Sequence, residues 1–577
     1  MSVLHSKMEI LKGSIFPIFL LINTRALGTS SLKHSLSYDG KDFTLLPGHV
    51  SGSNILLHGS FVNLINQTGW SILKINTMSH FPDNIQAYGA GYIEAYMTKD
   101  LIYNHWRNTI VGYCNGKEKI CEGIQGFLSK NLNYIRSMTT NSKREKSSYW
   151  HHVALFYDQI RGITEGYNKY APPGRSISAE DIFFMNVMGD VEDLEQVFSH
   201  RLNISLPDKV LGSGSCSALI RLLPGNRDLY AAHDTWNSYQ SMLRIIKKYK
   251  FGLHWVLQKF PEKDDKHTIP GRSMSFSGYP GTVFSMDDFN VIPSSGLVSI
   301  ETTIGNGNAS LWQYVQPIGT VLEGIRATVA NRLARSGGHW VSVFSKRNSG
   351  TYNNQWMVVD YKRFKPGEKI IRPGLLWVLE QIPGRIHYTD VTGVLKKIGY
   401  WPSYNSPYFK DIFNMSGGPE AVAKFGNWFS YEKTPRALIF KRDAPKVHNM
   451  GSMMKIMRYN DFRHDPISRC NCTPPYSAEN AISARCDLNP KNGTYPFGAL
   501  GHRSHGGTDM KITSFDLFMK GSFIAGGGPT YDSVEPFQWS KADFGKTTPH
   551  FGHPDKWAFK PIKVDWENAF NRDEDVV

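Results

Sequence analysis

The sequence has no hydrophobic run long enough to span a membrane. A membrane-spanning helix needs about 20 consecutive apolar residues, and no stretch of this chain approaches that length. Internal repeats and long low-complexity linkers are also missing, which excludes a solenoid or a largely disordered chain. The 577 residues are 41% hydrophobic and 13% aromatic, a composition typical of globular proteins, and the length suggests several domains.

Positive charge is plentiful but not concentrated. The chain carries 65 Lys and Arg against 50 Asp and Glu, a formal net charge of +15, yet it has no long basic cluster. We therefore expect a basic surface spread over a large protein and no nucleic-acid partner. Weak peripheral contact with anionic lipid surfaces stays open.

Two common kinds of catalytic motif are missing. There is no H-E-x-x-H and no C-x-x-C pair, so the sequence predicts no metal and no other cofactor. The run His505-Gly506-Gly507 has the form of an esterase oxyanion loop. However, no G-x-S-x-G nucleophile motif accompanies it. We expect a turn there.

The N-terminus has the pattern of a secretory signal peptide. Lys7 and Lys12 precede the apolar run 15–22, and the small residues Ala26 and Gly28 follow it. We predict a signal peptide over residues 1–28, with an uncleaved anchor as the alternative. Six glycosylation sequons agree with the secretory pathway, at Asn66, Asn203, Asn308, Asn414, Asn471 and Asn492, of which Asn471 is the weakest because Cys472 follows it.

The six cysteines fall into three groups. Cys114 and Cys121 flank a polar turn, and we predict that they form a disulfide. Cys470, Cys472 and Cys486 suit one further bridge, and the sequence does not say which of them is left over. Cys216 is isolated in the sequence and is expected to be free.

Hydrophobic periodicity predicts alternating strands and helices. Residues 85–107 have the spacing of a helix, 140–150 read as a loop, and 200–215 read as an exposed connector. Beyond the connector we expect strands at 217–223, 229–233, 296–304, 310–315, 339–345 and 354–361, and helices at 237–250 and 320–338. This order predicts an α+β fold in which helices cover an antiparallel sheet.

Cys216 lies where the Gly/Ser connector meets an apolar run ("GSGSCSAL"). A core cysteine or half of a disulfide is one interpretation. The other is a nucleophile whose base is an adjacent histidine or its own α-amino group. The second base requires a cut between Ser215 and Cys216, and Gly212 and Gly214 allow the backbone strain of an N-to-S acyl shift.

The segment "CSALIRLLPG…DLYAAHDTWNSYQSMLRIIKKYKF" resembles the signature of the phospholipase B-like family, as do "GWSILKINT", "SSGLVSIETTI" and "SGTYNNQWMVVDY". The similarity runs from about residue 40 to about residue 570. It implies a lysosomal glycoprotein with the four-layer αββα sandwich of N-terminal-nucleophile hydrolases. It also implies self-cleavage before Cys216 into fragments 29–215 and 216–577, which stay associated.

Several residues are candidates to assist Cys216. His233 and Asp234 end the strand expected to pair with the Cys216 strand, and we predict that His233 orients or polarises the thiol. Trp236 is expected to wall the pocket. The alternatives are a solvated strand-end histidine and a plain core tryptophan.

Acyl transfer also needs hydrogen-bond donors for the oxyanion. Asn353 and Asn354, after a turn, are the amide candidates, and Thr303 is expected to add a hydroxyl or backbone N–H. Arg458 resembles the late arginine of related cysteine amidases. A simple turn pair and a surface ion pair are the alternatives.

The sequence thus predicts a self-processing cysteine hydrolase of the lysosome lumen or the extracellular space. By resemblance it would release fatty acids from phospholipids. An amidase acting on N-acyl lipids or peptide-like amides is the close alternative. A lipid-binding glycoprotein with little turnover is the second.

Overall fold

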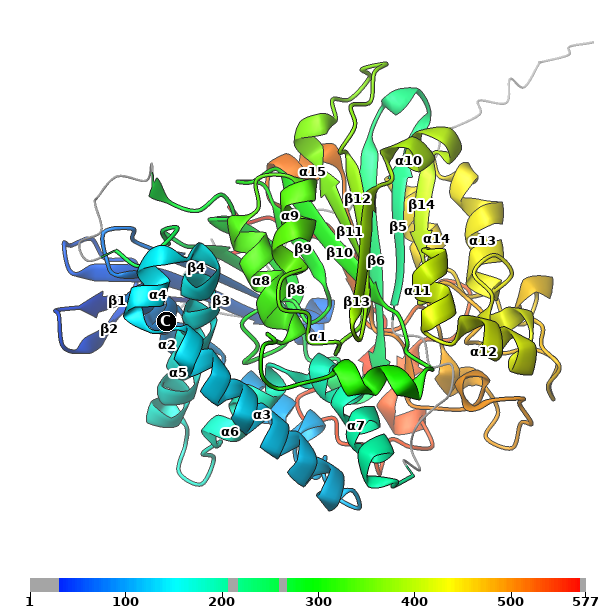
Figure 1. The fold of residues 1–577 in the computed structure, drawn as a ribbon, viewed down its shortest axis with the longest axis horizontal. Helices are drawn as coiled ribbons and strands as arrows, with labels where there is room; N and C mark the ends of the chain where they lie inside the picture. The colour runs from blue at the N-terminus through cyan, green and yellow to red at the C-terminus, as the bar shows by residue number, and fades with distance from the viewer. Residues whose placement is uncertain (1–30, 206–215, 259–266, 571–577) are drawn as a thin grey trace, which may run out of the picture.

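The computed structural model describes residues 31–205, 216–258 and 267–570 (Figure 1). The signal peptide expected at 1–28 and Ser215 lie outside the described residues. Within them the chain forms two large sheets with helices packed on both, which confirms the α+β class.

The first sheet has eleven strands. In spatial order they are β13 (Arg385–Asp390), β12 (Leu376–Ile382), β11 (Asn354–Asp360), β10 (Leu297–Thr303), β9 (Phe289–Ile292), β8 (Ser273–Gly278), β7 (Ile245–Lys250), β4 (Trp70–Thr77), β3 (Ile55–Leu64), β1 (Leu32–Tyr38) and β2 (Phe43–Pro47). All neighbours are antiparallel except β4 and β7, which pair in parallel with Ser71 opposite Ile245. This pairing joins the parts of the chain before and after the connector in one sheet.

The second sheet has seven strands and carries Cys216. In spatial order they are β14 (Tyr400–Ser403), β5 (Cys216–Leu222), β6 (Leu229–Ser238), β16 (Asp509–Thr513), β17 (Ile524–Gly527) and β20 (Ile562–Lys563), with β15 (His505–Gly507) paired to β6.

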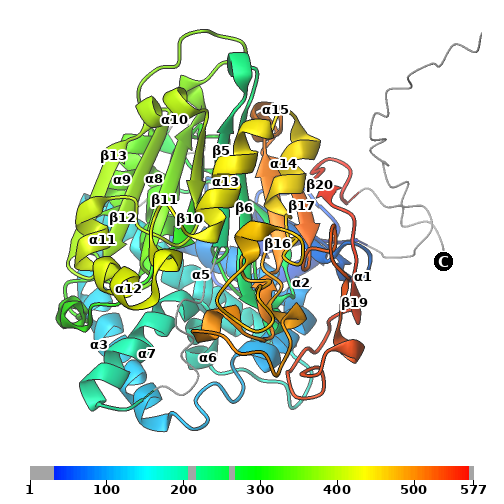
Figure 2. The ribbon, with the colours of Figure 1, turned by 90° about the vertical axis from the view of Figure 1, so that its right-hand side faces the viewer.

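The two sheets pack face to face between two layers of helices. A cluster that includes Ala218 and Ala231 fills the space between the sheets. The outer face of the first sheet is covered by α2 (Asp83–Thr109), α3 (Glu118–Met138), α5 (Ser148–Tyr170), α8 (Glu323–Leu333) and α9 (Gly337–Phe344). The outer face of the second sheet is covered by α13 (Pro435–Asp443) and α14 (Met450–Met457), in front of it in Figure 2.

Glycines allow the close packing of α2 on α5. A Cβ atom on Gly91 would lie 2.0 Å from the carbonyl oxygen of Gln159, and one on Gly162 would lie 2.0 Å from that of Tyr88. No other residue fits at either position, so the two helices are locked by backbone contact.

Three of the sequence-based assignments are wrong. Residues 237–250 are not a helix but the end of β6, a short 3-10 turn and β7. Residues 339–345 belong to helix α9, and 310–315 to a 3-10 helix at Ala309–Tyr314. Strand β7 was misread because both of its faces are buried: Ile245 and Tyr249 contact the outer helices, whereas Ile246 faces the second sheet. When both faces of a strand are buried, its apolar residues no longer alternate with polar ones, and their spacing can match that of a helix.

Other boundaries also shift. The expected loop at 140–150 contains the short helix α4 (Asn141–Lys146) and the start of α5. The expected helix at 320–338 is only α8, and Gly337 begins a helix rather than ending one. The helix expected at 85–107 and the strands expected at 217–223, 296–304 and 354–361 are confirmed. The strand expected at 229–233 continues to Ser238, so His233 and Asp234 lie in the middle of β6 and do not end it.

The structure contains the predicted disulfide and settles the pairing that the sequence left open. The Cys114–Cys121 disulfide is confirmed, with a Cα–Cα distance of 5.9 Å. Cys470 pairs with Cys472, so Cys486 is the late cysteine left over. Cys216 is a free thiol, as expected.

Candidate active site

Cys216 is the first residue of β5 and lies opposite Thr235 of β6. Its side chain faces the first sheet, as do those of Ala218 and Ile220. Although only 4% exposed, it lines a cavity of about 650 Å³. Residues from distant segments line the same cavity, among them Trp236, Tyr279, Thr303, Tyr404, Asn405 and Arg436.

Two side chains hold the backbone of Cys216. The Asn405 Oδ1 atom accepts a hydrogen bond from the Cys216 N–H (3.4 Å), and the Asn405 Nδ2 atom donates one to the Thr303 carbonyl (2.6 Å). On the other side, Arg436 donates to the Cys216 carbonyl at 2.5 Å. The Arg436 guanidinium also lies over the Trp236 ring, 4.2 Å from its centroid. The first residue of β5 is therefore fixed at both its N–H and its C=O.

The thiol of Cys216 is kept protonated in the intact chain. Burial raises its pKa well above the ordinary value, and Glu301 raises it further. The backbone N–H of Trp236 and the ammonium of Lys511 act in the opposite direction without cancelling burial. Such a thiol needs a base to become a nucleophile.

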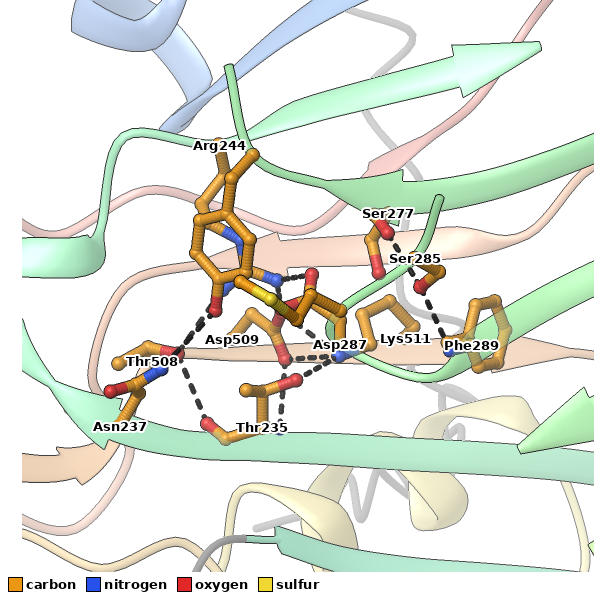
Figure 3. A network of polar contacts seen from close by, with 12 residues as sticks. Thr235, Asn237, Arg244, Ser277, Ser285, Asp287, Phe289, Thr508, Asp509 and Lys511 are labelled. Atoms are coloured by element: carbon orange, nitrogen blue, oxygen red, sulfur yellow. Dashed lines mark hydrogen bonds and ion pairs between the residues drawn. The ribbon is translucent and has the colours of Figure 1, made fainter. Parts of the chain in front are cut away.

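A buried ionic network fixes the residue opposite Cys216 (Figure 3). Lys511 donates to the Thr235 hydroxyl at 2.6 Å and to Asp509 at 2.7 Å. Arg244 is ion-paired with Asp509 and with Asp287. Because the network pairs the buried charges, it can hold Thr235 in place without an unpaired charge near the thiol.

The structure places His233 and Asp234 on opposite faces of β6. His233 faces the same way as Cys216, and its Nε2 atom donates to the Glu301 carbonyl at 2.8 Å. Its Nδ1 atom lies 3.4 Å from the Thr235 hydroxyl, and burial lowers the pKa of the ring well below its usual value. His233 is thus a neutral ring beside the hydroxyl of Thr235, the residue that pairs with Cys216 across the two strands. Asp234 lies on the helix-covered face, where burial raises its pKa.

Of the remaining candidate residues, two line the cavity and two have hydrogen-bond partners elsewhere. Trp236 and Thr303 line the cavity. Asn354 instead donates to Glu323 at 3.0 Å, and Asn353 donates to Asp193 at 2.9 Å. In β11 the side chain of Asn354 shares a face with Trp356, which packs under the outer helices. Neither amide is among the described residues that line the cavity of Cys216.

Arg458 also lies outside the lining of the cavity. Its Nε atom is 3.0 Å from Asp532, and its guanidinium lies over the Tyr531 ring. The structure thus gives it an ion-pair partner rather than a contact with Cys216.

Sequence reasoning missed Asn405, Arg436, Lys511, Asp509 and Arg244. Only Asn405 carried a local signal, because it lies in the turn-forming run "SYNSPY" and adopts a left-handed backbone with φ of 64°. The others are ordinary charged residues in sequence, and only the fold brings them to the thiol.

Two buried carboxyl groups make the protein's stability dependent on pH. Burial raises the pKa of Asp190 to about 6 and that of Glu380 to about 7. Each group keeps in the folded state a proton that the unfolded chain releases near its ordinary pKa. The stabilisation is therefore complete at acid pH and is lost as the pH rises through 6 to 7.

We expect the free energy of unfolding to be higher near pH 5 than near pH 8, by about 1.5 kcal/mol from Asp190 and about 2.5 kcal/mol from Glu380. Urea unfolding at the two pH values measures it. Asp190→Asn and Glu380→Gln should flatten the dependence, because an amide does not titrate. An unchanged slope in both variants would show that other groups set it.

Within the described part of the chain, one group of side chains offers three different ligand atoms for a metal. Glu479, Cys486 and His505 place a carboxylate oxygen, a sulfur and a ring nitrogen within 4.8 Å of one another. This group lies outside the immediate surroundings of Cys216, although His505 lines the same cavity.

Comparisons with known proteins find similar sequences over most of the chain. A family model described as "Phospholipase B" matches residues 57–564. The mouse protein named putative phospholipase B-like 2 is 50% identical over 516 residues, which cover 88% of this chain and 84% of that protein. A Caenorhabditis elegans protein of the same name is 40% identical over 577 residues, which cover 99% of this chain and 96% of that protein. Among the described residues, no helix has the length and apolar character to cross a membrane.

Proposed function

The chain belongs to the phospholipase B family, and on that premise we propose that it is a self-processing hydrolase whose nucleophile is the thiol of Cys216. The observation that carries the proposal is the position of this residue. Cys216 begins a buried strand at the wall of a cavity, and its N–H and C=O are held by Asn405 and Arg436. A nucleophile that becomes residue 1 of its fragment needs such anchoring.

The architecture supports an N-terminal-nucleophile hydrolase sandwich. Helices, a sheet, a second sheet and helices follow one another as layers, and the proposed nucleophile starts a strand of the second sheet. After the cut, fragments 29–215 and 216–577 would remain together because β4 and β7 share a continuous ladder.

Maturation would proceed by an N-to-S acyl shift. The Cys216 sulfur adds to the Ser215 carbonyl carbon, the C–N bond breaks, and the nitrogen becomes an α-amino group. Water then hydrolyses the thioester, which leaves a carboxylate on Ser215 and a free thiol on Cys216. The new amino group has an ordinary pKa of about 7.7 to 8.0, which suits it to accept the thiol proton during turnover.

Turnover would then repeat the same chemistry on a substrate. The thiolate adds to an acyl carbonyl, the leaving group departs with a proton, and water hydrolyses the acyl thioester. The names of the relatives favour phospholipid esters as the substrate class, with release of fatty acids. Apolar side chains in the cavity suit an acyl chain, namely Met188, Met286, Ile304, Phe413, Trp428 and Phe429.

Activity profiling of the processed protein tests this function. Mixed acyl phospholipids and N-acyl amides are incubated with the protein and with Cys216→Ala, and released fatty acids and amines are quantified. Fatty-acid release that depends on Cys216 supports the proposal. Release from amides alone would make the protein an amidase, and tight lipid binding without release would make it a lipid-binding glycoprotein.

The maturation step makes a separate prediction. We expect the larger fragment of the purified protein to begin Cys-Ser-Ala-Leu, because the cut is made by the residue that follows it. N-terminal sequencing and intact mass measure this. A fully active protein that stays a single chain after incubation at acid pH would contradict it.

We further propose that the protein follows the secretory pathway to the lysosome lumen or the extracellular space. Two disulfides suit an oxidising compartment. Asn308 is half-buried, and the other sequon asparagines are exposed, at Asn66, Asn203, Asn414, Asn471 and Asn492.

A further inference from the structure

A second free cysteine lies behind the cavity wall and has no role in the chemistry of Cys216. The Cys486 thiol donates to Glu479 Oε2 at 2.8 Å, and its sulfur is 4.0 Å from His505 Nδ1. We propose that Glu479, Cys486 and His505 form a binding site for one divalent ion of the zinc class. The proposal is independent of whether the protein hydrolyses lipids.

The three ligand atoms match the preferences of zinc. Zinc binds cysteine sulfur at about 2.3 Å and histidine nitrogen or carboxylate oxygen at about 2.0 to 2.2 Å. A tetrahedron with these bonds has ligand-to-ligand distances of roughly 3.3 to 3.7 Å. The sulfur and the Glu479 oxygen must therefore separate slightly, and the sulfur and the His505 nitrogen must approach slightly. A thiolate ligand favours zinc over calcium or magnesium, which prefer oxygen ligands.

The three side chains already have protein partners that a bound ion would replace or share. The Cys486 thiol proton, which now lies against Glu479 Oε2, must leave when an ion binds. Arg503 donates to two of the proposed ligand atoms, Glu479 Oε2 at 3.2 Å and Cys486 Sγ at 3.6 Å, and to the Ala499 carbonyl at 3.1 Å. An ion would have to bind on the side of these two atoms away from the guanidinium. Arg503 would thus orient the ligand carboxylate from outside the ligand set.

The cavity gives the ion a route to the site. Glu479 and Cys486 are at least 98% buried, whereas His505 is half-buried and lines the cavity that contains Cys216. Cys486 also packs against Trp236, which lines the same cavity. Three protein ligands leave a fourth position for water or an added ligand. The sequence has no metal-binding motif at this site, because the three ligands come from a loop, a 3-10 turn and strand β15.

Metal titration of the full-length protein tests the site. The protein is stripped with a chelator and titrated with Zn²⁺ in competition with a chromophoric chelator near neutral pH. We expect one equivalent bound tightly by the wild-type protein and by Cys216→Ala, which removes the other free thiol. Cys486→Ser should lose this equivalent, and His505→Gln and Glu479→Gln should each weaken binding by about tenfold or more.

Co²⁺ gives a spectroscopic check of the ligands. A sulfur-to-cobalt charge-transfer band is expected in the wild-type protein and not in Cys486→Ser. Thermal melts show whether that variant folds, and His505→Gln gives the answer if it does not. The proposal is overturned if the wild-type protein binds no equivalent, if Cys486→Ser or His505→Gln binds as well as wild type, or if only Cys216→Ala loses the metal.

Discussion

Cys216→Ala is expected to leave the chain uncut after Ser215 and to reduce turnover to background. One thiol supplies the nucleophile for both reactions, and no other side chain that lines the cavity is a cysteine. Removing the nucleophile of a hydrolase costs roughly a million-fold in kcat. Intact mass reports the cut, and single-turnover kinetics with a fluorescent acyl substrate report the chemistry.

Cys216→Ser is the matched variant. A hydroxyl is a weaker nucleophile than a thiol but can still take part in an acyl shift, so slow cutting is expected with little turnover. Thermal melts of both variants exclude misfolding as the cause, since alanine and serine each fit the space of the buried thiol. If Cys216→Ala kept hydrolysis while His233→Ala lost it, the nucleophile would lie elsewhere.

The sequence was most informative where a local pattern had one physical meaning. The Gly/Ser run before Cys216 and the largely apolar run after it predicted the start of β5, and every residue of that strand is buried, Arg221 included. Strand β7 was misread because a strand buried on both faces loses the alternation that identifies strands. Its Lys247 is buried too, paired with Glu94 from helix α2.

The candidate site was predicted only in part, because its residues are distant in sequence. Asn405 is 189 residues from Cys216 and Arg436 is 220 residues from it, so no spacing rule connects them. Asn354 was a reasonable amide donor by chemistry. Which face of a strand a side chain occupies depends on what covers each face, and α8 covers the face of Asn354. The sequence could therefore propose suitable residue types, but not which of them the fold brings to the cavity of Cys216.

Asn405→Gly is expected to lower kcat of the processed protein by about 100-fold with little change in KM. In the intact chain Asn405 Oδ1 accepts from the backbone N–H of Cys216. After the cut that nitrogen is the proposed base, and Asn405 would fix its distance to the thiol. A misplacement of about 1 Å in a catalytic group costs about 100-fold. Glycine removes the side chain and tolerates the left-handed backbone of this position, where φ is 64°.

Two further substitutions separate the hydrogen bond from the backbone. Asn405→Ala should lose the same activity and also destabilise the fold by about 1 kcal/mol, because alanine is strained in this conformation. Asn405→Asp keeps an acceptor oxygen and tolerates the backbone, but it loses the donor to the Thr303 carbonyl, so its kcat should fall between those of wild type and Asn405→Gly. A purely structural role would not alter the pH profile, whereas loss of an acceptor lowers the pKa of the Cys216 ammonium. The acidic limb of the kcat profile should therefore move to lower pH in Asn405→Gly. If Asn405→Gly, once cut, turns over like wild type, or if its pH profile does not move, the acceptor is not what positions the base.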